Sequence, residues 1–165
     1  MKKFFLLGMP TAGKSTIGKF IGEKSGLNYI DLDNRIEIAL GKSINDIFLE
    51  KGESFFRDKE THLLNEIIDN KTNFILALGG GTPCFNHNMK KINKSGISIF
   101  VDRPINFIIN NLKKTKNRPL LNDKNSLKES VNILYKNRIS YYKKSNYKVK
   151  NREEALSIIN SNSKS

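Results

Sequence analysis

Residues 8–15 carry the clearest chemical signal in the sequence, because they read Gly-Met-Pro-Thr-Ala-Gly-Lys-Ser. This octapeptide fits G-x-x-x-x-G-K-[ST], the pattern of a phosphate-binding loop between a strand and a helix. In such loops backbone N–H groups surround a phosphate, and the helix N-terminus adds unpaired donors and a positive dipole end. We expect Lys14 to reach the β- and γ-phosphates and the Ser15 hydroxyl to bind Mg²⁺. The motif predicts a nucleoside triphosphate substrate but does not identify the phosphate acceptor.

Two aspartates, Asp31 and Asp33, follow the short apolar segment 27–30, which we expect to be a strand. Ligands of parallel α/β sheets bind beyond the carboxyl ends of the strands, and alternation along an extended chain would put both carboxylates on one side. They would repel each other unless a cation or a substrate hydroxyl lies between them. We assign Asp31 to the Mg²⁺ site and Asp33 to a substrate hydroxyl, whose proton it can accept. The alternative makes Asp33 the N-cap of the following helix, and the two roles are compatible.

Arg57 and Arg138 are candidates for binding an anionic substrate. Arg57 lies beside the apolar stripe of the expected helix 53–70, three positions before Glu60. The two form either an ordinary surface ion pair or a unit in which Glu60 holds Arg57 toward a substrate. Arg138 falls on the inward stripe of the expected helix 126–144, where a guanidinium is costly unless it meets an anion. Its fork suits a carboxylate, which could belong to the protein or to the substrate.

Two further segments, residues 79–81 and 113–124, lie where a ligand would be enclosed. Gly79-Gly80-Gly81 follow the expected strand 73–78. Three glycines indicate either a group that approaches the backbone closely or a very tight turn, and the position at a strand end favours the close approach. Residues 113–124 are polar, rich in cations and include Arg118. They predict a mobile lid over the phosphates, with a plain exposed loop as the alternative.

The order of strand and helix patterns predicts a single α/β domain with a parallel sheet over residues 1–160, followed by a frayed tail at 161–165. Five segments are expected to be strands, namely 4–7, 27–30, 73–78, 97–101 and 147–149. No apolar run is long enough to span a bilayer. Cys84 is the only cysteine, which excludes an intrachain disulfide and suits a reducing cytoplasm.

The net charge is strongly positive, with 29 Lys and Arg against 16 Asp and Glu, a net of +13. Nucleic acid is one partner that such a charge permits. The lysines are scattered along the chain, however, so solvated surface charge explains them better. We therefore expect no specific nucleic-acid partner. Part of the excess positive charge would help to bind two anionic substrates.

Taken in order, the motifs resemble those of the shikimate kinase family, a member of the nucleoside monophosphate kinase-like P-loop group. The resemblance covers residues 3 to about 160. It rests on the phosphate loop followed by Thr16, Asp31-Leu32-Asp33, Gly41-Lys42-Ser43-Ile44, Gly52-Glu53, Phe56-Arg57 with Glu60, Gly79-Gly80-Gly81, Arg118-Pro119-Leu120-Leu121, and Arg138 with Tyr142. The loop alone is widespread, but the combination is specific.

The resemblance implies a three-layer P-loop kinase fold, in which helices flank a five-stranded parallel sheet and a mobile lid closes over it. It implies MgATP-dependent phosphorylation of the 3-hydroxyl of shikimate, on the route to chorismate and the aromatic amino acids. Separately, we expect a cytoplasmic protein that is a monomer. The implied catalytic residues are Asp33, Lys14 and Arg118. The implied substrate-binding residues are Asp33, Arg57, Gly79, Gly80, Gly81 and Arg138. The expected nucleotide-binding residues are Thr11, Ala12, Gly13, Lys14, Ser15, Thr16, Arg118 and, as a candidate adenine contact, Arg152.

Two alternatives remain at this point. A gluconate kinase-like enzyme would keep the phosphate loop and the fold, whereas the paired Arg57 and Arg138 indicate a carboxylate acceptor rather than a neutral sugar. A non-catalytic nucleotide- or nucleic-acid-binding protein would use the positive charge, and its binding would depend strongly on salt.

Overall fold

The structure is a computed structural model that describes residues 1–115 and 126–163. The predicted lid, residues 113–124, lies outside the described part of the chain except for its first three positions. Arg118 lies outside it as well, so its predicted role stays a prediction.

Within the described residues, five parallel strands form one sheet in the order β2-β3-β1-β4-β5. Their bounds are β1 Lys3–Leu7, β2 Asn28–Asp31, β3 Phe74–Ala77, β4 Ile97–Val101 and β5 Tyr147–Val149. The central strands β1, β3 and β4 are almost wholly apolar and buried, as expected for a parallel sheet covered on both faces. Each predicted strand is present, and its ends agree with the prediction to within one residue.

Helices connect the strands and cover the sheet. The helices are α1 Lys14–Ser25, α2 Leu32–Leu40, α3 Ile44–Asp69, α4 Asn88–Ser95, α5 Ile105–Lys114, α6 Leu127–Tyr142 and α7 Arg152–Ser163, with a 3₁₀ turn η1 at Thr82–Cys84. The predicted break before residue 53 is a kink inside α3, where Gly52 has φ 79° and ψ 172°. None of these helices, within the residues described, is long and apolar enough to cross a membrane.

The end of α7 differs from the prediction. The pattern predicts a final helix over 152–160, but α7 continues to Ser163. Two side chains support this last turn, because Ser161 Oγ donates to the Ser157 carbonyl at 2.9 Å and Asn162 Nδ2 donates to the Ile158 carbonyl at 2.8 Å. Both side chains reach back one turn, to carbonyl groups four residues earlier in the same helix.

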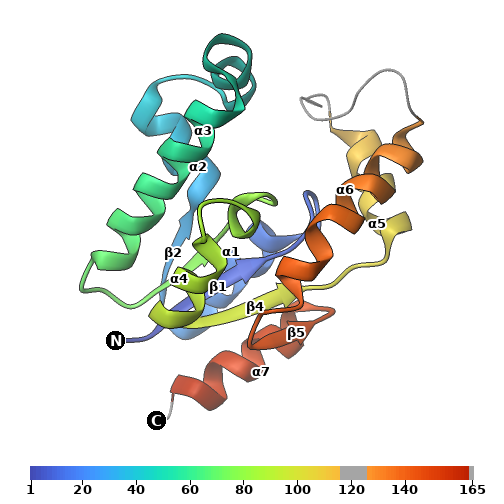
Figure 1. Cartoon of the computed structure of the whole chain (residues 1–165). Helices are drawn as coiled ribbons and strands as arrows, with labels where there is room; N and C mark the ends of the chain where they lie inside the picture. Colours follow the sequence, from blue (N-terminus) through green and yellow to red (C-terminus); the bar gives the residue numbers. More distant parts are fainter. Residues whose placement is uncertain (116–125, 164–165) are drawn as a thin grey trace.

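Two helix pairs rise on opposite sides of the carboxyl edge of the sheet (Figure 1). The pair α2 and α3 packs together on one side, and the pair α5 and α6 packs together on the other. The phosphate loop, the start of α2 and the glycines after β3 all lie at this edge because they directly follow strand ends. The predicted arrangement, a five-stranded parallel sheet flanked by helices, is confirmed for the described residues.

Candidate active site

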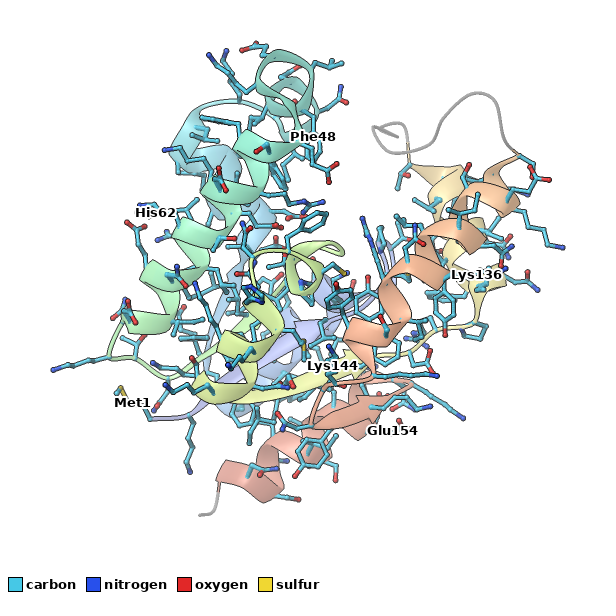
Figure 2. The ribbon with its side chains drawn as sticks, in the orientation of Figure 1. Met1, Phe48, His62, Lys136, Lys144 and Glu154 are labelled. Carbon is cyan, nitrogen blue, oxygen red and sulfur yellow. The ribbon has the colours of Figure 1, made fainter. Side chains whose placement is uncertain are left out.

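A cavity of about 510 Å³ opens at the carboxyl edge of the sheet, between α3 on one side and α5 and α6 on the other. Phe48, labelled in Figure 2, lines it from α3. The cavity brings together most of the predicted site residues, namely Thr11, Gly13, Lys14, Ser15, Thr16, Asp31, Asp33, Arg57, Gly79, Gly80, Gly81 and Arg138. Residues that lie more than 100 positions apart in the sequence therefore line a single space.

Two predicted nucleotide-binding residues do not line this cavity. Ala12 is buried within the loop, and its backbone N–H donates to the Met9 carbonyl at 3.2 Å. Arg152 begins α7, where its guanidinium lies 4.5 Å from the centre of the Phe20 ring and pairs with Glu153. The adenine contact assigned to Arg152 stays a prediction.

The phosphate loop follows β1 directly, and Lys14 starts α1. Lys14 Nζ donates to the carbonyl oxygens of Gly8 at 3.0 Å and Met9 at 2.8 Å. Burial lowers the pKa of the Lys14 ammonium to about 8, and the nearby Asp33 carboxylate opposes this shift. The lysine is thus held at the mouth of the loop, as a phosphate-binding lysine must be.

Helix α5 fixes the outer part of the loop. Thr11 has a positive φ of 59°, which is uncommon for a residue with a side chain. Thr11 Oγ1 donates to the Ile108 carbonyl at 3.2 Å, and Asn111 Nδ2 donates to the Thr11 carbonyl at 3.2 Å. The two bonds hold Thr11 in this conformation from a helix about 100 positions away in the sequence.

Asp31 and Ser15 form a pair of oxygen ligands beside the loop. Ser15 Oγ donates to Asp31 Oδ2 at 2.7 Å, and the Tyr29 hydroxyl donates to the same oxygen at 3.0 Å. Mg²⁺ prefers oxygen ligands and needs only one or two protein groups besides phosphate oxygens and water. The chemistry of this pair fits the predicted magnesium site.

The positions of Asp31 and Asp33 differ in detail from the prediction. Asp31 is the N-cap of α2, because its Oδ1 accepts the Asn34 backbone N–H at 3.3 Å. Asp31 is the last extended residue and the helix begins at Leu32, so strand alternation does not determine the direction of the Asp33 side chain. The alternative in which Asp33 is the N-cap of the helix is wrong. Asp33 lies in the first turn of α2 and still reaches the cavity.

Asp33 is half-buried, and its carboxyl group lies near both positively and negatively charged side chains. Burial raises its pKa to about 6, Lys14 opposes this shift, and the carboxylates of Glu60 and Asp31 add to it. A carboxyl group with this pKa is ionised at neutral pH and is a better proton acceptor than an ordinary aspartate.

Arg57 and Glu60 are a buried pair rather than a surface one. Arg57 is 6% exposed and Glu60 is fully buried, so the surface alternative is wrong. Arg57 Nη1 donates to Glu60 Oε2 at 2.9 Å, while Nε and Nη2 donate to Glu53 Oε1, each at 3.2 Å. The guanidinium also lies 4.3 Å from the centre of the Phe85 ring. These contacts hold Arg57 extended along one wall of the cavity.

Arg138 differs from Arg57 because the protein does not neutralise it in the same way. It comes from α6 and is 6% exposed. Within residues 1–115 and 126–163, no carboxylate oxygen lies within 4.0 Å of its guanidinium. A buried guanidinium in this position strongly favours an anionic ligand. Of the two sources of an anion considered for Arg138, a carboxylate of the described part of the protein is therefore not in ion-pair contact with it.

The three consecutive glycines at 79–81 each lie against a different site residue. A Cβ atom would lie 2.7 Å from Asp33 Oδ1 at position 79, 2.9 Å from Arg138 Nη1 at position 80 and 2.5 Å from Arg57 Nη2 at position 81. None of the three has a positive φ. Close approach of other groups, rather than a tight turn, is what requires glycine here.

Comparisons with known proteins agree with this geometry. A family model described as Shikimate kinase matches residues 10–162. A shikimate kinase from Persephonella marina is 38% identical over 141 residues, which cover 86% of this chain and 84% of that protein. The chain belongs to the shikimate kinase family. It is accordingly a small-molecule kinase that uses a nucleotide.

Solved structures separate the shikimate kinase family from the alternatives. The shikimate kinase from Acinetobacter baumannii, determined in complex with shikimate, superposes with a TM-score of 0.90 at 30% identity, covering 98% of this chain and 94% of that one. A gluconokinase from Sinorhizobium meliloti has a TM-score of 0.51 at 13% identity, covering 82% of this chain and 74% of that one, and shares the fold alone. The comparisons favour a shikimate kinase over a gluconate kinase-like enzyme or a non-catalytic binding protein.

Among the residues that were not predicted, three polar ones hydrogen-bond to residues of the site. Tyr29 could have been found, because strand alternation puts it on the same side as Asp31. Thr82 follows the glycines directly, but its sequence position does not reveal that its hydroxyl donates to Glu60 Oε1 at 2.6 Å. Asn111 has no signal in the sequence, since its partner Thr11 lies in a distant segment.

Proposed function

We propose that this protein transfers the γ-phosphoryl group of MgATP to the 3-hydroxyl of shikimate, giving shikimate 3-phosphate and ADP. This reaction lies on the route to chorismate and the aromatic amino acids. The observation that carries the proposal is the buried Arg138, which has no carboxylate within ion-pair distance among the described residues and lines one cavity with Lys14 and Asp33. A phosphate-binding loop beside a carboxylate-binding cation suits a hydroxy acid as the acceptor.

The phosphate side of the reaction depends on the loop and α1. Phosphoryl transfer needs in-line placement of the reacting groups and neutralisation of charge on the moving phosphoryl group. Lys14 supplies positive charge, and the backbone N–H groups at the start of α1 supply further donors. Ser15 and Asp31 would hold Mg²⁺, which neutralises phosphate charge when bound. Arg118 is expected to contribute a further cation from the lid.

The acceptor side depends on Asp33 and the two arginines. Arg57 and Arg138 bind the shikimate carboxylate from opposite walls of the cavity, which fixes the orientation of the ring. Asp33 then accepts a hydrogen bond from the reacting hydroxyl and takes its proton. With a pKa of about 6, Asp33 is ionised for this task at neutral pH. The residues 79–81 allow the substrate and all three side chains to approach one segment of backbone.

We further propose that the enzyme acts as a monomer in the cytoplasm. The single cysteine, Cys84, is half-buried and free, which suits a reducing compartment. Size-exclusion chromatography with light scattering tests the oligomeric state, and a particle of twice the 18.8 kDa chain mass would contradict it.

The decisive experiment is ADP release from MgATP with and without shikimate, in the wild type, Asp33→Asn and Asp69→Asn. Asp69 is an exposed residue at the end of α3 and serves as the matched control. We expect turnover that requires shikimate, falls by about 10²–10⁴-fold in Asp33→Asn and is unchanged in Asp69→Asn. ADP release that ignores shikimate, or that responds better to gluconate, would refute the assignment.

A further inference from the structure

The Glu60 carboxylate is held by two donors on opposite sides. Its Oε2 accepts Arg57 Nη1 at 2.9 Å, and its Oε1 accepts Thr82 Oγ1 at 2.6 Å. Glu60 and Thr82 are both fully buried. Each carboxylate oxygen thus has one side-chain donor, and the orientation of Glu60 depends on both.

Thr82 is itself fixed by its backbone. It is the first residue of η1, and its N–H donates to the Gly79 carbonyl at 3.1 Å. Its carbonyl accepts Asn88 Nδ2 at 3.0 Å. The Thr82 hydroxyl is therefore a rigid donor that connects the glycine segment to Glu60 on α3.

Three side-chain oxygens converge beside Gly79. A Cβ atom at this position would lie 2.7 Å from Asp33 Oδ1, 3.0 Å from Thr82 Oγ1 and 3.1 Å from Glu60 Oε1. Two carboxylates this close repel each other. The hydroxyl proton of Thr82 goes to Glu60 Oε1, which keeps Glu60 in place beside Asp33 and leaves its other oxygen for Arg57.

We propose that Thr82 is a positioning residue for recognition of the substrate carboxylate. Its hydroxyl orients Glu60, and Glu60 orients the Arg57 guanidinium that binds the carboxylate. Without the hydroxyl, Glu60 Oε1 loses its side-chain donor and the carboxylate rotates. The Arg57 guanidinium then no longer points correctly at the substrate carboxylate. The inference rests on the proposed function and deepens it.

The test compares Thr82→Ala with Thr82→Ser, because these variants differ by the hydroxyl group alone. We expect KM for shikimate to be about 10-fold higher in Thr82→Ala than in Thr82→Ser, since a buried acceptor loses its hydrogen bond. KM for ATP should stay within about twofold in both variants, and Thr82→Ser should stay close to the wild type. Thr72→Val, at an exposed residue before β3, is the control for handling and folding.

A second readout separates positioning from a merely structural role. Shikimamide, the neutral amide of shikimate, lacks the charge that Arg57 binds. The difference in kcat/KM between the Ala and Ser variants should therefore nearly disappear with shikimamide. Equal KM values for shikimate in the two variants, or an equal loss with the amide, would overturn the inference. A wild type that does not use shikimate would instead overturn the proposed function, so the two failures are distinguishable.

Discussion

Arg57 and Arg138 are both 6% exposed, yet only the removal of Arg57 should lower the stability of the fold. Arg57 is paired with Glu53 and the fully buried Glu60. Arg138 has no carboxylate within 4.0 Å among the described residues. We therefore compare Arg57→Met with Arg138→Met, because methionine keeps a long, flexible and apolar side chain at each position.

The expected magnitudes follow from the partner that each substitution leaves behind. Arg57→Met leaves the Glu60 carboxylate buried without its cation, which costs about 3–5 kcal/mol of folding free energy. At 2–4 °C per kcal/mol for a chain of this size, the melting temperature should fall by roughly 10 °C. Arg138→Met removes a buried charge and leaves no carboxylate unpaired. The Tyr142 hydroxyl loses its hydrogen bond with the guanidinium but still donates to the Gly80 carbonyl, so the fold should be unchanged or more stable by about 1–3 kcal/mol.

Activity should fall in both variants, because each loses a cation that we propose binds the substrate carboxylate. Truncating one partner of a buried charge pair costs about 2–5 kcal/mol, so kcat/KM for shikimate should fall by at least about 30-fold. Arg138→Met would then be a much less active protein that is at least as stable as the wild type. Such a result is the signature of a residue kept for function at the expense of stability.

The assay is thermal unfolding without ligands, followed by circular dichroism, together with steady-state kinetics. Arg35→Met, at an exposed position on α2, is the control and should shift stability by less than about 0.5 kcal/mol. A clear loss of stability in Arg138→Met would show that Arg138 has a stabilising partner in the protein. Retention of stability in Arg57→Met would show that Glu60 does not depend on Arg57.

Three further predictions concern Asp33, Lys14 and Tyr29. Because burial raises the pKa of Asp33 to about 6, kcat/KM for shikimate should fall below pH 6. The same shift means that the ionised Asp33 destabilises the fold, so Asp33→Asn should be more stable than the wild type at pH 7 by up to about 3 kcal/mol. Chemical denaturation at several pH values should show this gain disappearing below pH 4. Because burial lowers the pKa of Lys14 to about 8, kcat/KM for ATP should fall above pH 8 in a pH–rate profile, and a flat profile to pH 10 would contradict this assignment. Because the Tyr29 hydroxyl donates to Asp31 Oδ2, Tyr29→Phe should reduce the gain in ADP affinity on adding Mg²⁺ by about threefold to tenfold in calorimetry, while affinity without Mg²⁺ stays constant.

Much of the fold and the site could be predicted because the signals are local. The apolar runs predict the central strands, and the apolar stripe at helical spacing predicts α6. Arg138 could be recognised because it is the single cation on that stripe. The direction of parallel strands then indicates which residues gather at one edge, which brings Asp33 and the residues 79–81 together.

What could not be predicted depends on side-chain geometry. A pattern places Asp31 at a strand end, but the choice between Asp31 and Asp33 as the N-cap depends on where the backbone turns. The contact between Thr11 and Asn111 joins segments about 100 positions apart and follows no periodicity. The difference between the two arginines is likewise invisible in the sequence, because it depends on which carboxylates lie nearby in space.

The contacts of residues 79–81 have a consequence for how this segment tolerates mutation. Each glycine lies against one residue of the site, Asp33 at position 79, Arg138 at position 80 and Arg57 at position 81. Three adjacent positions thus determine how closely three site residues approach the backbone. A substitution at any one of the three positions therefore also displaces the particular side chain that lies against it, Asp33, Arg138 or Arg57.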